Sequence, residues 1–163
     1  MVKINIICIG KIKEGFFADA AKEYIKRLEA YCRLTIEEIP ETRVTPNAHE
    51  GDIEAALAKE AAALELRLPG RGKQGLTAAM CVEGKQLGSE QFSKLLKTCE
   101  SVGKTPIYFI IGGSNGLHPR VKEQADLLIS ASEMTFPHHL FRVMLLEQIY
   151  RAYKIAEGSK YHK

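Results

Sequence analysis

Glycines and hydroxyl-bearing residues follow two apolar runs in the C-terminal half of the sequence. The run Ile107–Ile111 leads into Gly112-Gly113-Ser114-Asn115-Gly116, and the run Leu127–Ser130 leads into Ala131-Ser132-Glu133-Met134-Thr135-Phe136-Pro137. Paired glycines let the backbone approach a ligand closely and expose N–H donors. Met and Phe among hydroxyls suit a flat, partly apolar ligand whose edge needs hydrogen bonds. The two segments therefore predict a ligand-binding site.

Neither segment matches a standard phosphate-binding motif, so other interpretations stay open. The glycines are spaced GGxxG rather than GxGxxG, and the Gly-Lys-Ser/Thr ending of a P-loop is missing. A tight turn between a strand and a helix explains Gly112–Gly116 equally well, and Met134 and Phe136 could instead fill the core. A third apolar run ends at Met80-Cys81-Val82-Glu83-Gly84 and is a further candidate wall.

Positive charge gathers in the last 26 residues, which carry five cations against two carboxylates, while the whole chain has a net charge of +3. The excess lies beside His138, His139 and His162. Concentrated positive charge attracts polyanions. The alternative is that cations at the end of a helix complement its dipole.

Strand and helix patterns alternate along the chain and predict one α/β domain, residues 1–163, in which helices flank a mostly parallel sheet. In such sheets ligands collect outside the carboxyl ends of the strands, so the three candidate segments should meet at one edge. The expected strands are Ile4–Ile9, Leu34–Ile39, Leu76–Val82, Ile107–Ile111 and Leu127–Ser130. The expected helices are Phe16–Tyr31, Ile53–Arg67 with Asp52 as its cap, Glu90–Val102 with Ser89 as its cap, a short helix from Pro119 to about Ala125, and His138–Glu157.

The composition is that of an ordinary soluble globule, with 45% hydrophobic and 26% charged residues in 163. The apolar runs fall far short of the ~20 residues that a membrane span needs, and the N-terminus reads as a strand rather than a signal peptide. We therefore expect a cytoplasmic protein without membrane association. The cysteines lack zinc-site spacing, so we expect reduced structural thiols and no metal site; they are Cys8, Cys32, Cys81 and Cys99.

The last expected helix is too apolar to be covered easily within one small domain. From Leu140 to Leu146 only Arg142 is polar, and a helix that is apolar on all sides is buried on all sides. A second copy of the chain would cover it, and two-fold dimers are the commonest assemblies. We therefore expect a homodimer.

Four segments resemble one family in the order in which they occur. They are Met80–Lys85 (MCVEGK), Phe109–Leu117 (FIIGGSNGL), Ser130–Ile155 (SASEMTFPHHLFRVMLLEQIYRAYKI) and Tyr161–Lys163 (YHK). Over its whole length the chain resembles the smallest SPOUT, or trefoil-knot, methyltransferases, and specifically the bacterial enzymes that methylate N3 of a pseudouridine in large-subunit ribosomal RNA.

The resemblance implies a C-terminal trefoil knot that binds S-adenosylmethionine, and a homodimer in which the partner's tail completes each site. Base rates alone would argue against a knot. The cofactor-binding residues that the resemblance implies are Met80, Gly112, Gly113, Ser132, Glu133, Met134, Thr135, Phe136 and Pro137.

The substrate that the resemblance implies indicates which residues could take part in the methylation. The N3 imide proton of pseudouridine must leave, so a base or a cation near it would help. The candidates are His138, Tyr161 and His162; histidine exchanges protons near neutral pH, although His162 could also be a mere exposed terminal residue. The cations would bind RNA phosphates: Arg142, Arg151, Lys154, Lys160 and Lys163. The partner would be large-subunit rRNA, in an assembled ribosome.

Two other functions fit parts of the sequence. A non-catalytic RNA-binding ribosome-assembly factor would use the basic tail but would not need the apolar loop around Met134–Pro137. A nucleotide- or flavin-binding protein would bind a phosphate at Gly112–Gly116, where the fingerprint residues are missing.

Overall fold

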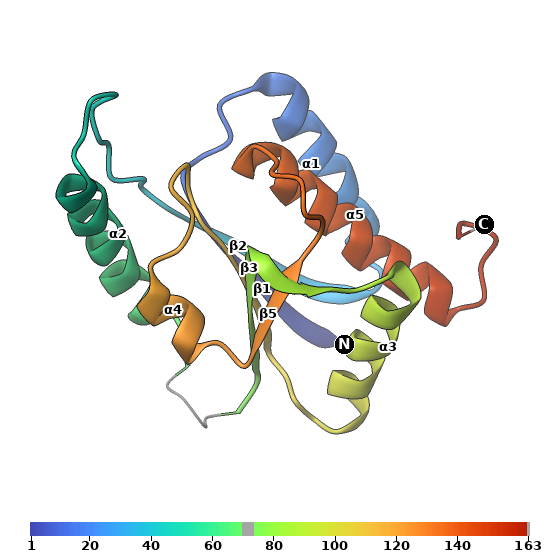
Figure 1. The fold of residues 1–163 in the computed structure, drawn as a ribbon. Coiled ribbons are helices and arrows are strands. Elements are labelled where there is room, and N and C mark those ends of the chain that lie inside the picture. The colour runs from blue at the N-terminus through green and yellow to red at the C-terminus, as the bar shows by residue number, and fades with distance from the viewer. Residues whose placement is uncertain (70–73, 163) are drawn as a thin grey trace.

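Strands and helices alternate along the chain (Figure 1), and its described residues form five strands and five helices. The computed structural model describes residues 1–69 and 74–162. The strands are β1 (Val2–Ile9), β2 (Cys32–Ile39), β3 (Leu76–Gln86), β4 (Ile107–Ile111) and β5 (Leu127–Ser130). The helices are α1 (Gly15–Leu28), α2 (Glu50–Glu65), α3 (Ser89–Ser101), α4 (Pro119–Gln124) and α5 (His138–Ala156). The expected α/β class with a parallel sheet is confirmed.

The sheet has the strand order β2-β1-β4-β3-β5, and every neighbouring pair is parallel. The helices α1, α3 and α5 cover one face, and α2 and α4 cover the other (Figure 1). Side chains of a strand point alternately to the two faces. On β1, Ile4 and Ile6 therefore enter the core under α1, α3 and α5, while Ile7 and Ile9 enter the core under α2 and α4.

The third strand is longer than the sequence pattern predicts. We expected this strand to end at Val82, but β3 continues to Gln86 and pairs twice with β5, with a register shift between Met80 and Lys85. Gly84 permits the second pairing, because a Cβ there would lie 2.6 Å from the backbone of Ile129. The interruption of the apolar pattern after Val82 is therefore an irregularity within β3 and not the end of the strand.

Two predicted helix caps are wrong in position. Helix α2 begins at Glu50, and the Asp52 carboxylate accepts a hydrogen bond from the backbone N–H of His49 at 3.0 Å. Asp52 therefore occupies the third helical position of a capping box rather than the cap itself. Helix α3 likewise begins at Ser89, so that Gly88 is its cap. Among the described residues, no helix is long and apolar enough to cross a membrane. The trefoil knot stays a prediction.

Arg142 is a buried structural residue. Its side chain is 2% exposed, and its guanidinium donates to the carboxylate of Glu38 and to the carbonyl oxygen of Gly10. This burial argues against a contact of Arg142 with an RNA phosphate, which stays a prediction. The one polar position of the apolar helix segment instead joins α5 to the ends of β1 and β2.

We expect Glu38→Ala to lower the free energy of unfolding by about 3 kcal/mol, because it leaves the buried Arg142 cation unpaired. Glu37→Ala is the matched control: it removes an exposed carboxylate that pairs with Arg67, and such surface pairs contribute about 0–1 kcal/mol. Urea denaturation of both variants measures the difference. Equal losses in the two variants would contradict a structural role for the buried pair.

Candidate active site

A pocket of about 340 Å³ lies at the carboxyl ends of β4 and β5 and beside the middle of β3, at Met80–Glu83. All three segments singled out in the sequence contribute to it. Seven of the nine residues implied as cofactor ligands line this pocket, whereas Glu133 and Pro137 are outside its lining. The seven are Met80, Gly112, Gly113, Ser132, Met134, Thr135 and Phe136. The parallel sheet therefore brings together residues that are more than 50 positions apart.

The glycine loop, residues Gly112–Gly116, is a tight turn and also a wall of the pocket. A Cβ on Gly112 would lie 2.4 Å from the carbonyl oxygen of Gly116, and Gly116 itself has a φ of +79°, which favours glycine. The Gly116 N–H donates to the Gly113 carbonyl at 3.0 Å. The two interpretations of this segment are therefore compatible: the turn folds the loop, and the folded loop lines the pocket.

The loop after β5 presents its large apolar side chains at the pocket rather than in the core. Met134 is 72% exposed and Phe136 is 36% exposed, so the core-filling alternative is wrong. The serines order this loop: Ser130 Oγ donates to the Ser132 carbonyl at 2.8 Å, and Ser132 Oγ accepts from the Met134 N–H at 3.0 Å. A partly apolar mouth with local polar groups is what a flat organic ligand requires.

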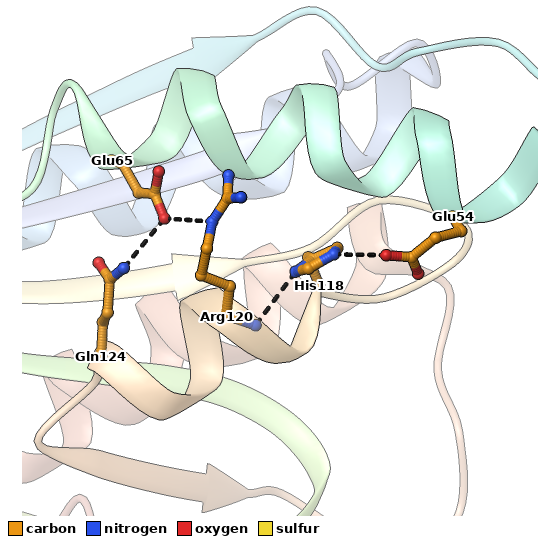
Figure 2. A network of polar contacts seen from close by, with 5 residues as sticks. All are labelled: Glu54, Glu65, His118, Arg120 and Gln124. Atoms are coloured by element: carbon orange, nitrogen blue, oxygen red, sulfur yellow. Dashed lines mark hydrogen bonds and ion pairs between the residues drawn. The ribbon is translucent and has the colours of Figure 1, made fainter.

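Helix α4, which follows the glycine loop, is fixed to α2 by the polar network in Figure 2. His118 caps α4: its Nδ1 accepts from the Arg120 N–H at 3.1 Å, so the ring proton lies on Nε2, which is 2.7 Å from a Glu54 carboxylate oxygen. The Glu65 carboxylate accepts from Arg120 Nε at 2.6 Å and from Gln124 Nε2 at 3.0 Å. The downstream end of the glycine loop is therefore held from two points on α2.

His138 lies in the pocket wall and is mostly buried, with 18% of its side chain exposed. Its Nε2 is buried and has no hydrogen-bond partner within residues 1–69 and 74–162, and the nearest carboxylate oxygen, from Glu41, is 4.0 Å away. Burial lowers the pKa of His138, and the neighbouring His139 and Arg142 lower it further against the raising influence of Glu41. A neutral imidazole at this wall can accept a proton.

Tyr161 and His162 do not join His138 within one copy of the chain. The Tyr161 hydroxyl donates to Glu147 at 3.1 Å, and its ring lies against Tyr150 and beneath the Arg151 guanidinium. Nε2 of His162 is 3.9 Å from a Glu90 carboxylate oxygen. Glu147 follows His138 by nine residues on α5, which corresponds to roughly 14 Å along the helix axis. The three predicted catalytic residues thus form two separate groups.

Two of the cations in the last 26 residues, Arg151 and Lys154, form ion pairs with neighbouring acids on or next to α5. Arg151 Nη2 is 2.6 Å from Glu147, and Lys154 Nζ is 2.8 Å from Glu157. Lys160 is exposed, and Lys163 lies outside the described residues. Two of the cations are therefore paired with acids near the helix end, and the contacts of these cations with RNA stay a prediction.

Several pocket residues gave no usable signal in the sequence. Phe141 lines the pocket from α5 and Leu117 from the end of the glycine loop, and Lys122 reaches the pocket from α4, where it pairs with Glu83. Phe141 and Leu117 resemble ordinary core residues in sequence. Lys122 follows a short helix pattern that could face solvent, so only the fold shows where these side chains point.

Comparison with known proteins points to one family. A family model described as "Predicted SPOUT methyltransferase" matches residues 2–162. The chain is 42% identical over 162 residues to the ribosomal RNA large subunit methyltransferase H of Streptococcus equi subsp. zooepidemicus, covering 99% of this chain and 100% of the relative. It is 44% identical, with the same coverage, to the protein of that name from Bifidobacterium adolescentis.

A solved structure supports the fold independently of sequence similarity. The crystal structure of a methylase family protein from Neisseria gonorrhoeae superposes with a TM-score of 0.53 at 13% identity, covering 90% of this chain and 81% of that protein. At such low identity the likeness concerns the fold alone.

We expect His138 to titrate below pH 6.5, the ordinary value for histidine, because its pocket wall disfavours the charged form. Between the folded-state pKa and pH 6.5 the unfolded chain then binds more protons than the folded chain, so the free energy of unfolding rises with pH across this window. Two-dimensional NMR of the imidazole resonances, assigned with His138→Asn, measures the pKa. Titration at or above pH 6.5 would contradict the burial argument.

Proposed function

The chain belongs to the SPOUT methyltransferase family, and from this premise we propose that it transfers a methyl group from S-adenosylmethionine to N3 of a pseudouridine in large-subunit ribosomal RNA. The observation that carries the proposal is the pocket between the middle of β3 and the ends of β4 and β5, which is lined by the segments that resemble the family. Relatives that match the chain from end to end are named as methyltransferases of this RNA.

The lining of the pocket suits S-adenosylmethionine. Its volume of about 340 Å³ lies within the range of small-molecule sites. Leu117, Met134 and Phe136 offer apolar surface to a flat base, while the serine hydroxyls and backbone groups of the two loops offer hydrogen bonds. The cofactor supplies an electrophilic methyl group, and the protein's task is to hold the nucleophile in line with it.

Deprotonation of N3 is the step for which the protein must supply a group. Neutral His138 at the pocket wall is one acceptor. Burial raises the pKa of Tyr161 to about 12, so its hydroxyl stays protonated and would donate a hydrogen bond rather than remove a proton. His162 is the second acceptor, and it can act only in a pocket to which the tail has access.

A homodimer would give the tail this access. Within one copy Tyr161 contacts Glu147, far along α5 from the pocket, so the tail would have to reach the pocket of a partner. The exposed apolar residues at the pocket mouth, Met134 and Phe136, and the half-buried apolar side of α5 would then be covered by the second copy. Each composite site would contain one chain's pocket and the other chain's Tyr161 and His162.

RNA would be held mainly through phosphates by the cations near this composite site. Lys160 is exposed, and Arg151 and Lys154 lie on the same helix end although acids pair with them; Lys163 completes the set. This small basic surface favours an assembled ribosome over bare RNA as the substrate, and such a substrate places the protein in the cytoplasm. A non-catalytic RNA-binding factor would not need the pocket.

Calorimetric titration of the purified protein with S-adenosylmethionine tests the proposal, with FMN and ATP as controls. We expect selective binding of S-adenosylmethionine, because the pocket combines a partly apolar mouth with hydrogen-bonding loops and lacks a phosphate-binding fingerprint. Binding must be followed by transfer of a labelled methyl group to large-subunit rRNA in ribosomes that lack the modification. A folded protein that binds none of the three ligands, or that transfers no label, would refute the proposal.

Deleting residues 161–163 should leave the affinity for S-adenosylmethionine within about twofold of the full chain and should abolish methylation. Tyr161 and His162 lie outside the pocket of their own copy, and the tail would complete the site of the partner. Calorimetry measures binding, transfer of labelled methyl groups to ribosomes measures activity, and light scattering checks that the dimer persists. Full activity of the truncated dimer would rule out a catalytic role for the tail.

A further inference from the structure

Glu41 joins two walls of the pocket from behind. It lies two residues after the end of β2, and its Oε1 accepts a hydrogen bond at 2.7 Å from the backbone N–H of Ser114, in the glycine loop. Its other oxygen, Oε2, is 4.0 Å from Nε2 of His138, at the start of α5. Its side chain is 27% exposed, and Glu41 is outside the lining of the pocket itself. A single carboxylate thus contacts both the loop and the helix that face the ligand.

The space behind Gly113 is filled by the same carboxylate. A Cβ on Gly113 would lie 2.7 Å from Oε1 of Glu41 and 2.9 Å from Cγ2 of Ile9. Glycine at this position is therefore required by the packing of Glu41 against the back of the loop. The absence of a side chain lets the carboxylate approach close enough to bind the Ser114 N–H.

The backbone beside Glu41 is anchored in turn. The Thr42 N–H donates to the buried Glu60 carboxylate of α2 at 2.7 Å. Burial alone would raise the pKa of Glu41, but the Ser114 hydrogen bonds and the nearby His138 and His139 outweigh it, so the net shift is downward. Glu41 is therefore ionised at neutral pH, and its hydrogen bond to the loop is charge-assisted.

We propose that Glu41 is a positioning residue that fixes the glycine loop and the His138 wall relative to each other, so that the S-adenosylmethionine pocket is formed before the ligand binds. This inference rests on the proposed function. Without the carboxylate, the Ser114 N–H would lose its hydrogen-bond acceptor. The loop would then become ordered only when the ligand binds, and this ordering would weaken the binding.

Two substitutions separate the hydrogen bond from the charge. Glu41→Ala removes both, and we expect about tenfold weaker binding of S-adenosylmethionine by calorimetry, the scale of one charge-assisted hydrogen bond. Glu41→Gln keeps an oxygen that can accept from Ser114, so its affinity should stay within about threefold of the wild type. The groups that face His138 are Glu41, Glu14, His139 and Arg142. Losing the Glu41 charge should therefore lower the pKa of His138 in both variants, measured by NMR.

Glu37→Ala is the matched control, since it removes a carboxylate of neighbouring β2 that pairs with Arg67 away from the pocket. It should change neither the affinity for S-adenosylmethionine nor the pKa of His138.

A change in the glycine loop tests the same contact. The added Cβ of Gly113→Ala should displace the Glu41 carboxylate and also weaken the binding of S-adenosylmethionine. In the double variant with Glu41→Ala and Gly113→Ala, the loss of binding free energy should be smaller than the sum of the two single losses. The carboxylate that Gly113→Ala displaces is already absent in Glu41→Ala. Additive losses would overturn the shared role.

Hydrogen exchange at the Ser114 amide tests the same inference without any ligand. We expect faster exchange in Glu41→Ala and near wild-type exchange in Glu41→Gln and Glu37→Ala, because only the first variant removes the acceptor. Unchanged exchange in Glu41→Ala would overturn the inference whether or not the protein binds S-adenosylmethionine. A wild-type protein with a protected Ser114 amide but no affinity for S-adenosylmethionine would instead refute the proposed function.

Discussion

Parallel pairing of all five strands is the constraint on which the site depends. Each parallel connection must cross back over the sheet, so every strand delivers its carboxyl end to the same edge. The glycine loop after β4 and the Met134–Phe136 loop after β5 meet there beside the Met80–Glu83 segment of β3, although the three segments are far apart in sequence. None of these segments would form a ligand-binding site by itself. They form a pocket because the parallel sheet brings them together.

The first turns of α5 connect this edge to the rest of the core through charged groups. Arg142 is bound to Glu38 and to the Gly10 carbonyl, so it ties the helix to the ends of β1 and β2. His138, one turn earlier, faces the pocket, and Glu41 lies between it and the glycine loop. Buried ion pairs add little net stability compared with apolar packing, but they fix geometry. Here the geometry that they fix is that of the pocket wall.

Sequence patterns were sufficient to place the strands and helices along the chain, apart from the end of β3 and two helix caps, because apolar periodicity is a local signal. They also indicated the three segments that line the pocket, because parallel strands bring their ends to one edge of the sheet. The sequence could not show the role of Arg142, since a cation in an apolar helix may face solvent, RNA or a buried acid, and only the position of Glu38, 104 residues away, decides among them. Glu41 was missed for the same reason: its partner is a backbone N–H in a loop 73 residues later. Contacts of this kind follow from tertiary structure and leave no pattern in the chain.

The separation of His138 from Tyr161 and His162 follows from the rigidity of α5. A continuous helix of 19 residues keeps its two ends apart. In the tail, Tyr161 contacts Glu147, Tyr150 and Arg151 near the far end of this helix, and His162 lies beside Glu90 of α3. In this arrangement Tyr161 and His162 do not line the pocket of their own copy. If the tail takes part in methyl transfer, it must either leave these contacts or enter the pocket of a second copy. In the second case a dimer is required by the chemistry and not only by the covering of apolar surface.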